Sequence, residues 1–208
     1  METAQRPVEA VVFDVGGVLV DWDPRHLYRR IFDDPGEMER FLAEICSPEW
    51  HAPHDRGVPT LPSCAALAQR HPEHAERIWA WALRSEEMIG GEVPGTASIL
   101  EALVAAGSRC YALTNMEAET YPSRRERFAF FELFEGVVVS GLEGVSKPDP
   151  EIFHRLLERY ALDAGATLFV DDNPANVETA ASLGMLTVRF ESADRLAARV
   201  AELGLLER

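Results

Sequence analysis

The chain has 208 residues, of which 47% are hydrophobic and 26% are charged, a balance typical of a folded globular protein and unlike a disordered tail. The formal net charge is −15, which disfavours partners such as nucleic acid or an anionic membrane surface, because both require a positive protein face. The three cysteines, Cys46, Cys64 and Cys110, are far apart in the chain and indicate neither a disulfide framework nor a thiolate zinc site.

Residues 1–9 are polar and contain no apolar segment of the kind found in signal peptides. No apolar stretch elsewhere approaches the roughly 20 residues that are needed to cross a bilayer. We therefore expect a cytoplasmic protein that does not bind membranes. The sequence leaves the oligomeric state open.

Short apolar runs alternate with helical patterns along most of the chain. The first run, residues 9–15, ends in an acidic residue and a glycine turn, and similar runs cover 111–113, 136–139, 168–170 and 186–190. Apolar residues at helical spacing predict helices over 96–106, 150–160, 173–184 and 193–203. Strands that alternate with helices of this length predict an α/β fold with a doubly wound parallel sheet.

Residues 23–90 interrupt this alternation. The segment begins with Asp23-Pro24, a helix cap and first turn, and carries further helical signals over 37–45, 61–70 and 73–89, without a convincing strand. We therefore predict an α/β core formed by residues 1–22 and 91–208, with a small all-helical domain, residues 23–90, inserted after the first strand.

Polar residues stand at or just beyond the ends of the first four predicted strands. They are Asp14, Thr114, Asn115, Lys147, Asp171 and Asp172. Ligands of open parallel sheets bind beyond the carboxyl ends of the strands, so we expect these side chains to converge at one edge. The sequence therefore predicts a functional site at this edge.

Three carboxylates in one cleft repel one another, and a divalent cation is the usual remedy. Oxygen ligands without a thiolate favour Mg²⁺ over zinc. A dication beside Asp14 would also relieve the repulsion between this carboxylate and an anionic substrate. Thr114 and Lys147 would then hold the remaining oxygens of a phosphate.

The same residues resemble, in order, four motifs of the haloacid dehalogenase (HAD) superfamily. The matching stretches are Asp14-Val-Gly-Gly-Val-Leu, Leu113-Thr114-Asn115, Ser146-Lys147-Pro148-Asp149-Pro150 and Val170-Asp171-Asp172-Asn173. The helical insertion resembles the cap domain that this superfamily carries at the first position, so the resemblance covers the whole chain. It implies a Rossmann-like core and a hydrolase that acts on a small phosphorylated metabolite.

The resemblance also implies a role for each matching residue. Asp14 is expected to be the nucleophile, which takes up the phosphoryl group as an aspartyl phosphate. Mg²⁺ is expected to be held by the Asp14 carboxylate, the Gly16 carbonyl oxygen and Asp172, with Asp171 acting through water. Substrate-binding residues around the transferred group are expected to be Gly16, Thr114, Asn115 and Lys147.

One position departs from the usual pattern of the phosphatases in this superfamily. Gly16 stands where they carry a second aspartate that serves as general acid and base. Some sugar-phosphate phosphatases of the superfamily resemble this chain in having glycine there. The departure therefore indicates a substrate with a good leaving group, such as an anomeric phosphate, or a proton from water, from the substrate or from another side chain.

The stretch from Trp50 to Gly57 mixes an aromatic ring, two imidazoles and a guanidinium. We interpret His54 and Arg56 in this stretch as candidate substrate contacts, with local pairing and core packing as the alternative. His51 and His54 are three residues apart, as two zinc ligands can be. No third ligand follows at a spacing typical of zinc sites, so we predict no zinc site. Residues 124–127 are interpreted as a solvated, charged helix face.

Two other functions remain open. A 2-haloacid dehalogenase would use Asp14 to displace halide without metal, although such enzymes resemble one another in carrying neutral residues where this chain has Asp171 and Asp172. A non-catalytic binding protein on the same fold is the second alternative. The intact set of Asp14, Thr114 and Lys147 argues against it.

Overall fold

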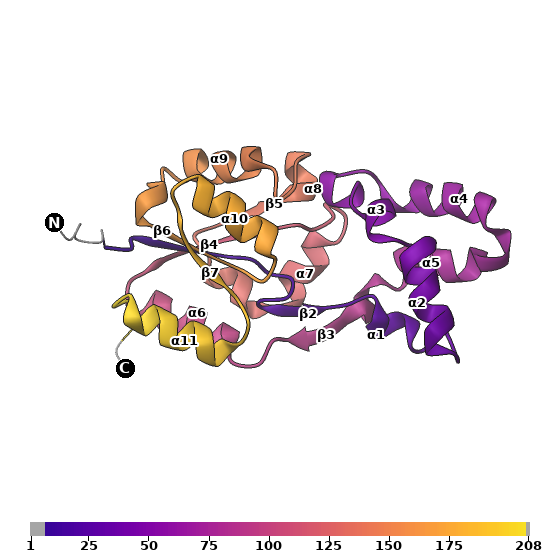
Figure 1. Ribbon diagram of the computed structural model, residues 1–208, viewed down its shortest axis with the longest axis horizontal. Helices are drawn as coiled ribbons and strands as arrows, with labels where there is room; N and C mark the ends of the chain where they lie inside the picture. The colour runs from indigo at the N-terminus through magenta and orange to yellow at the C-terminus, as the bar shows by residue number, and fades with distance from the viewer. Residues whose placement is uncertain (1–6, 207–208) are drawn as a thin grey trace.

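The structure, a computed structural model, describes residues 7–206 (Figure 1). Its centre is a five-stranded sheet with the order β5-β4-β1-β6-β7, and all of its strand pairs are parallel. The strands are β1 (Ala10–Phe13), β4 (Arg109–Thr114), β5 (Gly136–Val139), β6 (Thr167–Asp171) and β7 (Leu186–Arg189). They correspond to the five predicted runs, which confirms the doubly wound parallel sheet.

Helices cover both faces of this sheet (Figure 1). Helices α9 (Pro150–Arg159) and α10 (Pro174–Ser182) lie on one face, and α6 (Thr96–Ala105) and α11 (Ala193–Glu202) lie on the other. Strand β1 contributes to both layers, because Val11 and Phe13 pack on the α6 side and Ala10 and Val12 on the α9 side. A strand buried on both faces reads as a continuous apolar run, which is why the sequence revealed it.

The segment between residues 23 and 88 is helical and lies at one end of the molecule (Figure 1). Its main helices are α1 (Arg25–Tyr28), α2 (Pro35–Glu44), α3 (Pro48–His51), α4 (Thr60–Arg70) and α5 (Ala75–Leu83). Short 3-10 turns connect them, namely η1 (His54–Arg56), η2 (Pro72–His74) and η3 (Ser85–Met88). The segment has a hydrophobic cluster of its own, in which Tyr28, Phe41 and Trp81 are buried.

The sequence missed a two-stranded antiparallel ribbon where this segment joins the core. Strand β2 (Val20–Trp22) pairs with β3 (Ile89–Glu92). The predicted helix over 73–89 was wrong, because η2, α5 and η3 divide this stretch and the ribbon follows. Gly90 and Gly91 disfavour helix continuation, and a side chain at Gly90 would meet Asp21 in the paired strand at 2.2 Å.

Several short elements complete the core around the carboxyl ends of the strands. They are α7 (Tyr121–Arg127), η4 (Ala129–Leu133), α8 (Ser140–Glu143) and η5 (Ala164–Ala166). Helix α8 contacts the helical segment closely, since a Cβ added at Gly57, which has φ of +86°, would lie 2.6 Å from the Gly141 carbonyl oxygen. Only glycine allows this approach with that backbone conformation.

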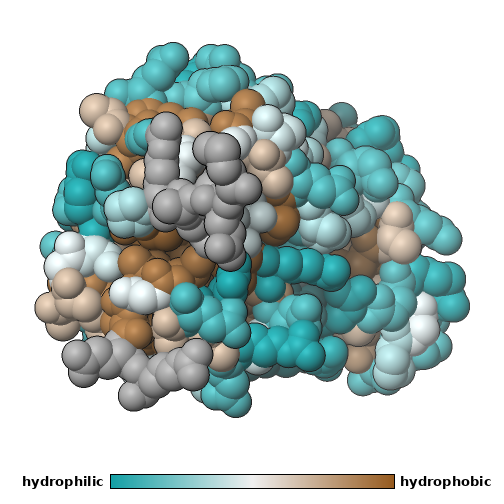
Figure 2. Space-filling view, turned by 60° about the vertical axis from the view of Figure 1, so that its left-hand side comes forward, coloured by the Kyte–Doolittle hydropathy of each residue, from teal (hydrophilic) through white to brown (hydrophobic). Residues whose placement is uncertain are grey.

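In Figure 2 hydrophilic residues cover the right of the view, whereas hydrophobic residues gather on its left. Among residues 7–206, none of the helices is both long and apolar enough to span a bilayer. Most of the polar stretch 1–9, from which we expected a cytoplasmic chain without a leader, lies outside the described residues.

Candidate active site

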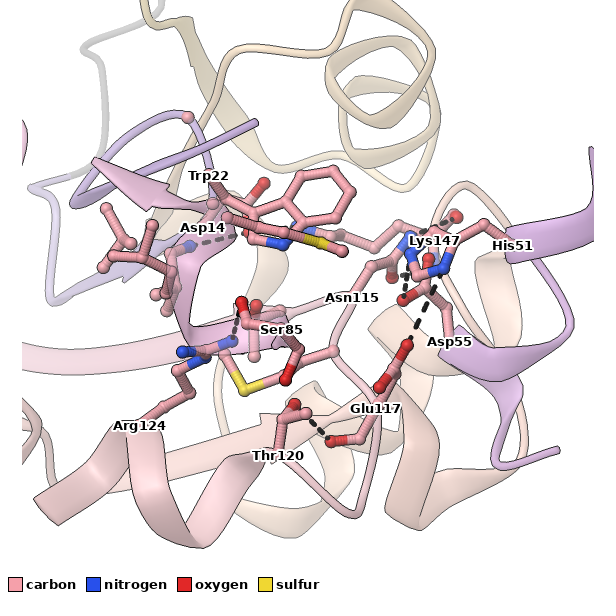
Figure 3. Close-up of a pocket in the computed structure, with 18 of the residues that line it drawn as sticks. Asp14, Trp22, His51, Asp55, Ser85, Asn115, Glu117, Thr120, Arg124 and Lys147 are labelled. Atoms are coloured by element: carbon pink, nitrogen blue, oxygen red, sulfur yellow. Dashed lines mark hydrogen bonds and ion pairs between the residues drawn. The ribbon is translucent and has the colours of Figure 1, made fainter. Parts of the chain in front are cut away.

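A cavity of about 300 Å³ lies between the carboxyl edge of the sheet and the helical segment. Most of the expected site residues line it, namely Asp14, Gly16, Thr114, Asn115, Lys147 and Asp172. The opposite wall includes His51, Asp55, Trp81, Ser85 and Met88. Figure 3 shows Asp14, Asn115 and Lys147 on one side of this cavity and His51 and Asp55 close to Lys147.

Lys147 is the central cation of the site, and its side chain is 0% exposed. The ammonium group donates to Asp171 Oδ2 at 2.7 Å and to the Leu113 carbonyl oxygen at 2.7 Å, and it lies 2.9 Å from Asp14 Oδ1. The two carboxylates and the lysine therefore form a buried charged triad, in which the lysine compensates part of the negative charge.

Asp171 lies behind this lysine and not at the cavity surface. It is fully buried, and its oxygens also accept hydrogen bonds from Asn176 Nδ2 at 3.0 Å and from the Asn173 N–H group at 2.8 Å. With its oxygens engaged in this way, Asp171 holds Lys147 in place. The expected role of Asp171 as a metal ligand through water stays a prediction, and the direct carboxylate ligands would be Asp14 and Asp172.

The buried charges shift one another's titration. Burial raises the pKa of Asp14, the nearby Lys147 opposes this rise, and the Asp171 carboxylate adds to it. Burial also raises the pKa of Asp172, with a further contribution from Asp171. Burial alone would lower the pKa of Lys147, but the two carboxylates that contact it outweigh this effect and raise its pKa. The site therefore has a deficit of positive charge.

The geometry of the acidic residues fits one shared dication. Asp14, Asp171 and Asp172 each offer an oxygen atom, and these atoms all lie within 4.8 Å of one another. Gly17 makes room for this arrangement, because a Cβ at this position, where φ is +76°, would lie 2.6 Å from Asp172 Oδ2. An all-oxygen donor set suits Mg²⁺.

Thr114 and Asn115 behave differently although they are neighbours. Thr114 lines the cavity and is 1% exposed, and its buried hydroxyl has no hydrogen-bond partner among the described residues. A buried hydroxyl without a partner is unusual and suits a ligand oxygen. The Asn115 amide instead donates to the Lys147 carbonyl oxygen and accepts from the Lys147 N–H, both at 2.9 Å. Its side chain thus positions the lysine loop.

Gly16 leaves open space where a second aspartate would stand. A Cβ built there has no atom within 4 Å, so a side chain could begin at this position without a clash. Two acids just downstream, Asp21 and Asp23, are not among the residues that line the cavity. Asp21 pairs with His26 at 2.9 Å, and Asp23 accepts the Arg25 N–H at 2.8 Å.

The two expected substrate contacts of the helical segment do not line the cavity. His54 is buried behind it, with its ring edge-on to Trp50, and Arg56 is exposed. The wall is formed instead by His51 and Asp55, which are four residues apart and face the same side. The structure thus does not place His54 or Arg56 at the cavity wall, because the sequence did not show which side of the turn faces the core, and their contact with substrate stays a prediction.

A family model described as haloacid dehalogenase-like hydrolase matches residues 8–184. The chain belongs to this family. A sesquiterpene phosphatase from Aspergillus oryzae is 30% identical over 86% of this chain and 87% of its own length. A phosphorylated carbohydrates phosphatase from Thermotoga maritima is 25% identical, over 86% of this chain and 82% of its own length.

Solved structures show the same fold for this HAD-like hydrolase. A HAD family enzyme from Bacteroides thetaiotaomicron aligns with a TM-score of 0.71 and 17% identity, covering 93% of this chain and 98% of that one. A second structure of that enzyme, in complex with magnesium and inorganic phosphate, aligns with a TM-score of 0.67 and 18% identity, covering 89% of this chain and 95% of that one.

Arg124 is one of the cavity residues of this HAD-like hydrolase that sequence reasoning missed. It was expected on a solvated helix face, but it is buried, its guanidinium lies 2.6 Å from Glu86 Oε2, and it lines the cavity. The run of charges around it gave no signal, because only the packing of α7 against η3 distinguishes Arg124 from its neighbours. The prediction of a solvated face was wrong for this residue.

Proposed function

We propose that this HAD-like hydrolase is a Mg²⁺-dependent phosphomonoesterase that uses Asp14 as its nucleophile. The observation that carries the proposal is the joint placement of Asp14, Lys147 and the unpartnered Thr114 hydroxyl at the cavity, with Asp172 close enough to share an ion with Asp14. Asp14, Asp172 and the Gly16 carbonyl oxygen would hold Mg²⁺. Bound Mg²⁺ supplies the positive charge that lets a carboxylate and a phosphate approach each other.

The reaction would proceed in two displacements at phosphorus. A carboxylate oxygen of Asp14 attacks the phosphorus atom, an O–P bond to Asp14 forms, and the bond to the leaving oxygen breaks. Water then attacks the aspartyl phosphate, which releases inorganic phosphate and regenerates the Asp14 carboxylate. Lys147 and the Thr114 hydroxyl bind phosphoryl oxygens in both steps and stabilise the charge that develops there.

The leaving oxygen needs a proton, and Gly16 cannot provide one. General acid catalysis contributes about 10²–10⁴-fold to such reactions, so turnover should depend strongly on the leaving group. The aryloxide of an aryl phosphate departs without a proton. The alkoxide of an alkyl phosphate requires one, either from water or from the substrate's own hydroxyl groups. A steep dependence of kcat on leaving-group pKa supports this account of Gly16.

Segment 23–90 would act as a cap that selects the organic part of the substrate. Much of the cavity wall is apolar, with Trp22, Trp81, Met88, Ile89, Phe128 and Phe131. Such a wall favours a phosphomonoester whose organic part has apolar surface, and one relative is a sesquiterpene phosphatase. The sequence expectation of a sugar phosphate is the competing choice, and a phosphorylated carbohydrates phosphatase is also a relative.

The central test is turnover of a generic aryl phosphate with and without Mg²⁺. We expect Mg²⁺-dependent phosphate release that is lost in Asp14→Asn. Chloride release from 2-chloropropionate in EDTA would instead support the dehalogenase. Absence of both reactions, without bound metal, would support a binding protein on this fold.

A substrate panel then separates the two organic classes. Prenyl and medium-chain alkyl phosphates should have higher kcat/KM values than hexose and pentose phosphates of similar leaving-group pKa. The opposite order would refute the role of the apolar wall, while leaving the phosphatase reaction itself supported.

A further inference from the structure

A second cluster of ligating side chains lies where the helical segment meets the core. It consists of His51 at the end of α3, His54 in η1 and Glu117 in the loop after β4, and we call it the His-His-Glu cluster. One ligating atom from each residue lies within 4.8 Å of the others. Figure 3 shows the His51 ring between the carboxylates of Asp55 and Glu117.

Both imidazoles of the cluster have an unsatisfied ring nitrogen. The Nδ1 atoms of His51 and His54 are buried and have no hydrogen-bond partner within residues 7–206. His54 is only 1% exposed, so bulk water does not satisfy its nitrogen. Buried polar atoms are paired in the great majority of cases, and two neighbouring exceptions point to a ligand that the chain itself does not supply.

The distance between His51 Nδ1 and Glu117 Oε1 is close to the separation of two ligand atoms on one metal ion. His51 Nδ1 lies 3.7 Å from Glu117 Oε1, which is too long for a hydrogen bond. Two ligands of a tetrahedral zinc ion, each about 2.0–2.1 Å from the metal, lie about 3.3–3.4 Å apart. A shift of a few tenths of an ångström would thus bring both atoms to ligand positions.

The other nitrogen of His51 has a carboxylate behind it. His51 Nε2 lies 3.6 Å from Asp55 Oδ1, which is also beyond hydrogen-bond distance, so the carboxylate acts on this nitrogen through its charge alone. Metal-binding histidines commonly direct their second ring nitrogen to a carboxylate, which fixes the tautomer and orients the ring. With its proton on Nε2, His51 would present the Nδ1 lone pair to the gap beside Glu117.

We propose that His51, His54 and Glu117 bind a divalent transition-metal ion, Zn²⁺, that joins the helical segment to the core. Two imidazole nitrogens and one carboxylate suit Zn²⁺, whereas Mg²⁺ requires oxygen ligands. His51 and Glu117 also line the large cavity, so an ion held here would lie beside this space and would take water as a further ligand.

This site differs from the Mg²⁺ site in both residues and donor type. It does not depend on the phosphatase proposal, because none of its three residues belongs to the Asp14 set. The sequence did not reveal it, since the third ligand follows the histidine pair by more than 60 residues. His71 and His74 have the same spacing as His51 and His54, but they are not part of a three-residue cluster among the described residues, which makes them a matched control.

The test is a zinc titration of the full chain in an Asp172→Asn background with excess Mg²⁺, which removes the acidic site as a competing zinc ligand. A chromogenic chelator in competition reports the affinity. We expect one Zn²⁺ per chain with a dissociation constant below about 1 μM. His54→Gln and Glu117→Gln should each weaken binding at least tenfold, whereas His74→Gln should not change it.

Co²⁺ provides a second measurement that does not require any variant of the cluster to fold. In the same background, Co²⁺ should give the intense visible absorption of a tetrahedral site, and Zn²⁺ should displace it. Absence of this absorption, or equal zinc affinity in Glu117→Gln and the control, would overturn the proposal. Mg²⁺-dependent turnover by the unaltered chain together with no zinc binding would refute the cluster alone, whereas zinc binding without turnover would refute only the phosphatase.

Discussion

The close approach of Gly17 to Asp172 allows the proposed Mg²⁺ site to be perturbed by the addition of one methyl group at Gly17. A Cβ at Gly17 would lie 2.6 Å from Asp172 Oδ2, where ordinary contact begins at 3.4 Å. In Gly17→Ala the carboxylate must therefore retreat by about 0.8 Å, whereas metal–ligand distances tolerate shifts of only about 0.2 Å. The variant should thus lose Asp172 as a ligand.

The positive φ of Gly17 adds a second effect of Gly17→Ala, a loss of stability from backbone strain. A variant at another glycine with positive φ, Gly107→Ala, measures this effect alone. Alanine in the left-handed region costs about 1–2 kcal/mol, and each kcal/mol lowers the Tm of a chain of this size by about 2–4 °C. Gly107, with φ of +88° and no atom within 4 Å of an added Cβ, should show the same loss of Tm in Gly107→Ala. Only Gly17→Ala should also lose affinity for Mg²⁺.

The assay is the rise in Tm that Mg²⁺ produces, measured across a magnesium titration. Loss of one ligand should raise the magnesium dissociation constant by about tenfold or more, which corresponds to about 1.4 kcal/mol. The same shift should appear in the Mg²⁺ dependence of aryl phosphate turnover. Equal magnesium affinity in the Gly17 and Gly107 variants would refute the assignment of Asp172 as a ligand.

Three further predictions concern buried groups. Lys147→Met leaves the Asp14 and Asp171 carboxylates uncompensated, so urea unfolding in EDTA should show a loss of about 3–5 kcal/mol; a loss below about 1 kcal/mol would contradict the buried triad. Arg124→Gln should raise KM for anionic substrates more than it lowers kcat if the guanidinium contacts bound substrate, and an unchanged KM would exclude that contact. Burial raises the pKa of Cys64 to about 11, and all three cysteines are buried, so thiol reagents at pH 8 should label the chain only on unfolding.

The sheet was predictable because its strands are buried on both faces and therefore stand out as apolar runs in the chain. The β2-β3 ribbon was not, since Ile89–Glu92 contains two glycines and its partner strand has two exposed residues. Pairing between residues 67 to 72 positions apart stabilises this ribbon, and neither of its strands has a strong local signal.

The convergence of the candidate site residues was predictable for a similar reason. Asp14, Thr114 and Asp171 end parallel strands, so the topology alone brings them to one edge of the sheet. Their separate tasks were not predictable from the sequence. Hydrogen bonds to Lys147 and Asn176 engage Asp171 and leave Asp172 at the cavity, and adjacent residues in the chain do not reveal which of them turns inward.

The sequence by itself determined the α/β fold, the family and the edge of the sheet where chemistry would take place, because these follow from periodic burial and from residues at strand ends. Only the tertiary structure decided which side chains face the cavity. Glu117 reaches it from the loop after β4, and Arg124 reaches it from helix α7. His51 and Asp55 reach it from the helical segment. Their positions depend on how the helical segment packs against the α/β core. That packing involves residues far apart in the chain, so no local sequence pattern predicts it.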